Sequence, residues 1–99
     1  MDFQQFKIDI EEKLIGKVTF DLQEFTYLPY VFGSGTLSYR IKGYNFRFIY
    51  DGRDNLLTCE RSDNHENYPQ CNWIELFQSS GLIIEQQTII DAISNGGKL

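Results

Sequence analysis

The chain has few of the residues that mark specialised chemistry: its 99 residues include two cysteines, two prolines, one histidine and one tryptophan. Two cysteines do not make a disulfide framework, and no Cys-x-x-Cys pair suggests a zinc site. The longest apolar run, residues 82–84, is far too short to cross a bilayer. The first residues contain neither a basic region nor an apolar run of signal length. We therefore expect a cytoplasmic protein without a membrane segment, metal or cofactor.

Positive charge is also scarce. Lys and Arg number 9 against 14 Asp and Glu, which gives a net charge of -5. Phosphate-backbone binding depends on accumulated positive charge, so this balance disfavours a nucleic-acid partner. Apolar residues make up 41% of the chain and aromatic residues 15%. That content is enough for one hydrophobic core, and the length predicts a single domain over residues 1–99.

The region from Leu37 to Arg61 predicts its own strand pairing. A two-residue turn at Lys42-Gly43 brings alternating apolar residues of two strands together. The expected pairs are Ile41 with Tyr44, Tyr39 with Phe46, and Leu37 with Phe48. After a second turn at residues 51–54, the expected pairs are Phe48 with Leu57 and Phe46 with Cys59. The result is an antiparallel meander with one polar face and one aromatic face, and helices must cover the aromatic face.

The segments before the meander predict a helix and a further strand. The helix is indicated by an apolar stripe at three- and four-residue steps, with Asp2 as its cap and Gly16 at its end. The stripe consists of Phe3, Phe6, Ile10 and Leu14. Alternation over residues 18–23 indicates a half-buried strand, which either continues past a bulge near Gln23-Glu24 and is closed by Pro29, or is short and ends near Gln23-Glu24.

The segments after the meander predict two short helices. Asn72 has the character of an N-cap, Gly81 of a stop signal, and the apolar residues between them are Trp73, Ile74 and Phe77. Residues 82–84 then form an extended linker or short strand, and a last helix covers residues 85–94. The expected fold is α+β, with an N-terminal helix, a four-stranded antiparallel meander and two short C-terminal helices packed on one face of the sheet.

No catalytic or metal-binding motif is complete. Cys59, His65 and Cys71 are evenly spaced, but a fourth soft ligand is missing and Cys59 is expected in the core. A small enzyme, or enzyme subunit, using the His65/Cys71 region remains an alternative, with Glu60 and Asp63 as the other contributors. No catalytic residue can be assigned.

A weak nucleic-acid-binding domain is the second alternative. Residues 42–48 carry a basic residue, a glycine and alternating aromatics, as in RNA-recognition strands. Asn45 and Arg47 depart from that pattern, and the aromatic rings are needed for the core. Only Arg40, Lys42 and Arg47 would supply the positive charge.

The favoured hypothesis is a small acidic protein-binding module without catalytic activity. Its size and charge are those common among inhibitors, immunity proteins and antitoxins. Ile49 is expected to face Leu56 on the polar side of the sheet, beside an acidic hairpin tip, which is a typical centre for a partner patch. The candidate partner-binding residues are Ile49, Leu56, Asp51, Arg53, Asp54, Asp63, His65 and Glu66. The expected partner is another protein, in the simplest case a basic one, and a homodimer through the polar sheet face is compatible with the same pattern.

Overall fold

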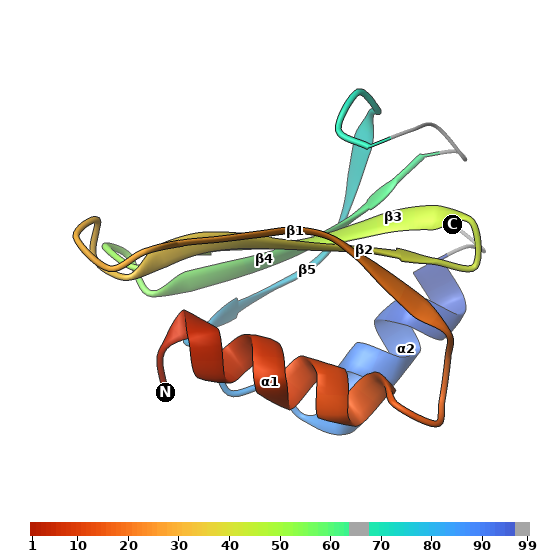
Figure 1. Ribbon diagram of the computed structural model, residues 1–99, viewed down its shortest axis with the longest axis horizontal. Coiled ribbons are helices and arrows are strands. Elements are labelled where there is room, and N and C mark those ends of the chain that lie inside the picture. The colour runs from red at the N-terminus through yellow and green to blue at the C-terminus, as the bar shows by residue number, and fades with distance from the viewer. Residues whose placement is uncertain (64–67, 97–99) are drawn as a thin grey trace.

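The computed structural model describes residues 1–63 and 68–96, which form one α+β domain. The elements in chain order are α1 (Phe3–Leu14), β1 (Phe20–Leu28), β2 (Ser34–Ile41), β3 (Tyr44–Asp51), β4 (Leu56–Ser62), β5 (Trp73–Ser80) and α2 (Gln86–Gly96). The five strands pair in sequence order, and every neighbouring pair is antiparallel. Both helices lie on one side of the sheet, and residues 68–72, which lead into β5, lie on the other side (Figure 1).

Helix α1 agrees with the sequence prediction. The Asp2 carboxylate accepts a hydrogen bond from the Gln5 backbone N–H at 2.8 Å, which satisfies one of the free amides at the helix start. All four residues of the predicted apolar stripe are buried. The Tyr39 hydroxyl donates to the Glu11 carboxylate at 2.7 Å, and this bond joins the helix to β2.

The predicted pairing of β2 with β3 is confirmed at every position, from Leu37 with Phe48 to Ile41 with Tyr44. Lys42 and Gly43 both have positive φ, as the primed turns of two-residue hairpins require. The bulge near Gln23-Glu24 is also confirmed, because the register of β1 against β2 shifts between Leu22 and Glu24.

The predicted register of β3 against β4 is wrong by two residues. The observed pairs are Phe48 with Cys59, Tyr50 with Leu57, and Phe46 with Arg61. The turn is centred one residue later than expected, because Asp51 pairs with Leu56 and residues 52–55 form the loop, with Asn55 at positive φ. A shift of two residues keeps each side chain on its predicted face. It also places Arg61 opposite Phe46 on the helix side, where Arg61 is buried with its guanidinium 4.5 Å from the Tyr44 ring centroid.

The predicted helix over residues 72–80 is wrong, and so is the four-stranded sheet, because this segment forms the fifth strand. Ile74 pairs with Arg61 and Phe77 with Cys59, so both lie on the helix side although they are three residues apart. The register shift opposite Cys59/Glu60 leaves Leu76 as the extra residue of a bulge. The bulge turns the two-residue period of a strand into a three-residue spacing that imitates a helix.

Only one helix follows the sheet among the described residues, not two. Its start at Gln86 is within one residue of the predicted start, and it continues to Gly96. In the linker before α2, Leu82 and Ile84 are buried in the core and Ile83 is exposed. The Lys13 ammonium donates to the Ile84 carbonyl at 2.8 Å and so ties the linker to α1. In the described part of the chain, neither helix is long and apolar enough to span a membrane.

One core lies between the sheet and the helices. Tyr39, Phe46 and Phe48 are buried there as expected, whereas Tyr44 is only half-buried at the β2–β3 turn. Cys59 is buried as predicted, and burial raises the pKa of its thiol, so this cysteine stays protonated.

Candidate functional site

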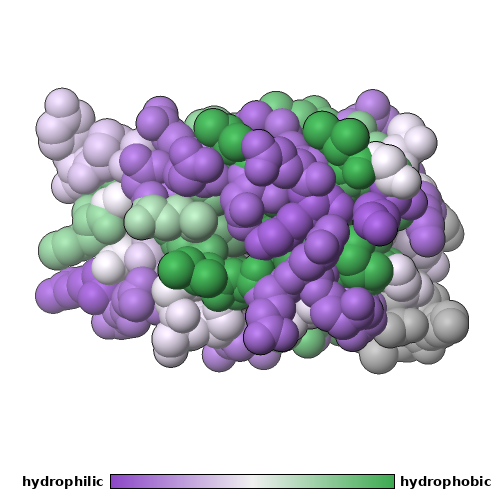
Figure 2. Space-filling model, turned by 90° about the horizontal axis from the view of Figure 1, so that it is seen from below, coloured by the Kyte–Doolittle hydropathy of each residue, from purple (hydrophilic) through white to green (hydrophobic). Residues whose placement is uncertain are grey.

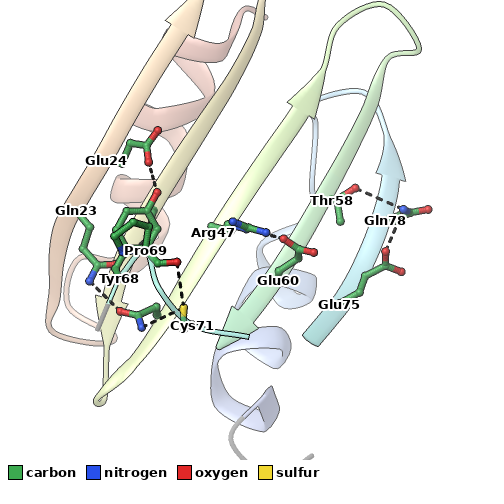
Figure 3. A network of polar contacts seen from close by, with 12 residues as sticks. Gln23, Glu24, Arg47, Thr58, Glu60, Tyr68, Pro69, Cys71, Glu75 and Gln78 are labelled. Atoms are coloured by element: carbon green, nitrogen blue, oxygen red, sulfur yellow. Dashed lines mark hydrogen bonds and ion pairs between the residues drawn. The ribbon is translucent and has the colours of Figure 1, made fainter. Parts of the chain in front are cut away.

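The polar face of the sheet has a covered half and an open half. Residues 68–71 fold back across β1, β2 and β3 (Figure 3). Under this segment Ser38 and Asn45 are fully buried, although the strand pattern places both on the polar face. The half of the polar face nearest the β2–β3 turn is therefore not available to a partner.

A hydrogen-bonded cluster fills the covered half. The Asn45 amide oxygen accepts from Gln23 Nε2 at 2.8 Å and from Arg40 Nη1 at 3.1 Å. Ser38 donates to the Gln23 amide oxygen at 3.0 Å, and Asn45 Nδ2 lies 3.8 Å from Cys71 Sγ. These bonds satisfy buried polar atoms, so the cluster holds the 68–71 segment on the sheet.

Two of the three cations proposed for nucleic-acid binding are already engaged. Arg47 Nε donates to the Glu60 carboxylate at 2.6 Å, and its guanidinium lies 3.9 Å from the Trp73 ring centroid. Arg40 is bonded to Asn45, which leaves Lys42 as the exposed one of the three. The pairing of Glu60 with Arg47 also gives this carboxylate a structural role.

The Tyr68 hydroxyl donates to Glu24 and ties the covering segment to β1. Burial and the Glu24 carboxylate raise the pKa of Tyr68 to about 12. Because the folded pKa lies above the unfolded value of about 10, this contact stabilises the fold fully below pH 10 and is lost between pH 10 and 12. We expect the difference between the absorbance titrations of the native protein and Tyr68→Phe to show one tyrosine ionising near pH 12. A difference step near pH 10 would contradict the contact.

Among the described residues, those proposed for an enzyme or metal site do not converge. Cys59 lies in the core on the helix side, whereas Cys71 contacts Asn45 on the opposite face. Asp63 is exposed, and its backbone N–H donates to the Asn72 carbonyl at 3.0 Å. His65 and Glu66 lie outside the described residues. Within residues 1–63 and 68–96, no three His, Cys, Asp or Glu side chains are grouped as metal ligands.

The open half of the polar face ends at the β3–β4 hairpin tip. Ile49 pairs with Thr58, and Leu56 with Asp51, so the expected facing of Ile49 and Leu56 is wrong. The two are diagonal neighbours on the same face, because the strand register differs by two residues from the predicted one. Both are half-buried.

The charged residues of that tip are exposed, as predicted. Asp51, Arg53 and Asp54 all lie at the surface. The Asp51 carboxylate accepts from the backbone N–H groups of Arg53 at 3.0 Å and Asp54 at 3.4 Å, which orders the loop.

A second tip, between β1 and β2, was not predicted as a site. Tyr30 is 99% exposed and Phe32 65% exposed, and Leu28 and Val31 beside them are also exposed. The sequence signal was an apolar run, residues 30–32, between Pro29 and Gly33, where a turn is expected to be polar. We call the combined set the hairpin-tip surface. It consists of Leu28, Tyr30, Val31, Phe32, Asp51, Arg53 and Asp54.

The two tips are joined to each other. The Gly52 backbone N–H donates to Ser34 Oγ at 2.9 Å, and Gly52 lies so close to the Phe32 carbonyl that a Cβ at position 52 would collide with it. The Arg53 guanidinium lies 5.7 Å from the Phe32 ring centroid. Both turns lie at the same end of the molecule, on the left in Figure 1. They therefore form one surface.

On the helix side of the molecule, the exposed apolar surface is interrupted. Figure 2 shows apolar side chains separated by polar ones over the helices.

Comparison of the chain with models of known protein families, with curated proteins and with solved structures finds no match.

Proposed function

We propose that this chain is a small protein-binding module without catalytic activity, and that it docks on its partner through the hairpin-tip surface. Ile49 and Leu56 extend that surface onto the open half of the sheet. An intracellular setting is part of the proposal, because Cys59 is a buried free thiol.

The exposure of Tyr30 and Phe32 is the observation that carries the proposal. An aromatic side chain has roughly 150–250 Å² of surface to bury, and each Å² removed from water contributes about 25 cal/mol. Neither ring is needed for the core, which closes under the two helices. Two adjacent rings that the fold leaves in water are typical anchors of a protein–protein interface.

The charge of the chain fits a protein partner with positive groups. Asp51 and Asp54 are exposed on the turn that packs against Phe32, and the net charge is -5. Acidic side chains at the border of a patch speed the encounter with a basic surface and hinder the approach of acidic ones.

The test is site-directed photo-crosslinking in cells of the source organism. A benzoylphenylalanine residue is placed at position 32 in one variant and at position 15 in another. Ile15 is a matched control because it is 67% exposed and follows the far end of α1 (Figure 1). We expect one protein adduct from position 32 that is absent from position 15 and is competed away by excess unmodified chain.

Equal adducts from both positions, or none from position 32, would remove the hairpin-tip surface as the docking site. A thermal melt of each variant shows whether the substituted chain is folded.

A further inference from the structure

We infer that the hairpin-tip surface is a pre-ordered wedge, with Tyr30 and Phe32 entering an apolar pocket on a partner protein whose rim is positively charged. This inference rests on the proposed function and specifies the partner's side of the interface.

The backbone of the β1–β2 turn has an unusual conformation at Phe32. Phe32 has a φ of 57°, a left-handed conformation that is uncommon for a bulky residue. The next residue, Gly33, also has a positive φ. The tip therefore presents apolar side chains outward at the price of local backbone strain, and such strain is concentrated at ligand-contacting segments.

Hydrogen bonds order the β1–β2 turn before any partner binds. The Val31 backbone N–H donates to the Leu28 carbonyl at 3.0 Å, and the Ser34 N–H donates to the Val31 carbonyl at 2.9 Å. The bond from Gly52 to Ser34 Oγ then fixes this turn against the neighbouring hairpin. A segment that is ordered before binding loses little conformational entropy on binding. The rings of this turn can therefore act as anchors without the turn having to become ordered at that moment.

The charges beside the rings favour a protein surface over a lipid surface. Asp51 and Asp54 lie on the neighbouring turn, and Arg53 is positioned over the Phe32 ring. Insertion of the rings into a membrane would bring both carboxylates to headgroups that are neutral or negative, without a fixed cation to pair with. A protein pocket can place Lys or Arg opposite each carboxylate, and charge-assisted hydrogen bonds would form there.

The experiment uses the protein captured by crosslinking from position 32, purified and unmodified, as the probe. Its dissociation constant is measured by calorimetry for the native chain, Tyr30→Ala, Phe32→Asn and Ile15→Ala. Asn removes the Phe32 ring but tolerates left-handed backbone, so the turn can persist. We expect each ring variant to weaken binding at least tenfold and Ile15→Ala to leave it unchanged. Asp54→Asn should slow association and reduce its salt dependence.

The outcomes separate the inference from the proposed function. A position-32 partner whose affinity falls less than tenfold in both ring variants would keep the docking site but refute the wedge. Absence of a position-32 partner would remove both. Sedimentation of the native chain, but not Phe32→Asn, with phosphatidylcholine vesicles would replace the protein pocket with a lipid surface. Thermal melts of all variants confirm that the chains compared are folded.

Discussion

Replacing Phe6 with alanine is expected to lower the free energy of unfolding by about 3–5 kcal/mol, the usual cost of truncating a buried phenylalanine. Phe6 is fully buried at the centre of the contact between α1 and the sheet. Its ring lies 5.5 Å from that of Phe3 in a stacked arrangement and 5.5 Å from that of Phe48 in an edge-on one. Alanine would leave a cavity between α1 and β3 that rigid neighbours cannot fill. Urea denaturation followed by far-UV circular dichroism measures the loss.

Ile8→Ala is the matched control on the same helix. Ile8 is on the solvent side, and alanine has the higher helix propensity, so we expect a change of less than about 1 kcal/mol. A loss below about 1 kcal/mol for Phe6→Ala as well would mean that α1 does not close the core.

The parts of the fold that follow from local chemistry could be predicted. The Asp2 cap and the apolar stripe specify α1 because both depend on residues a few positions apart. The β2–β3 pairing follows from Lys42-Gly43, since a two-residue turn leaves one register that keeps the aromatic residues together.

The errors have a different origin. The bulge at Leu76 changes the period of β5, so the spacing of Ile74 and Phe77 predicts the wrong element. The β3–β4 register depends on where the turn is centred, and the positive φ of Asn55, which places the loop at residues 52–55, is not marked by the alternation of the strands.

The candidate site could be predicted only in part. Asp51, Arg53 and Asp54 were predicted from turn chemistry, and they lie at an exposed tip. Their neighbour is the β1–β2 turn, about 20 residues earlier in the chain, and no local pattern brings the two together. The covering of the polar face depends on a contact between Tyr68 and Glu24 across 44 positions. Such contacts are set by tertiary packing, which hydrophobic periodicity does not encode.

The turn end of the β1–β2 hairpin gives the second large effect. Gly35 is buried on β2, and a Cβ at this position would collide with the Phe3 ring and the Thr26 carbonyl oxygen. The Phe3 ring is confined by stacked contacts with Phe25 at 5.9 Å and Tyr50 at 6.1 Å, so it cannot move aside freely. We therefore expect Gly35→Ala to lower the free energy of unfolding by about 2–3 kcal/mol, as overpacking of a filled core does.

A double-mutant cycle with Phe3→Leu identifies the atoms responsible. If the Phe3 ring is the main obstacle, Gly35→Ala should cost at least about 0.5 kcal/mol less in the Phe3→Leu background, because the smaller side chain gives way. Equal costs in both backgrounds would assign the whole effect to the Thr26 carbonyl. Because Gly35 lies close to the β1–β2 turn that carries Tyr30 and Phe32, crosslinking from position 32 in Gly35→Ala also shows whether α1 positions the hairpin-tip surface. Retained crosslinking in the destabilised variant would mean that the tip is ordered by its own turn and by Gly52, independently of the helix below.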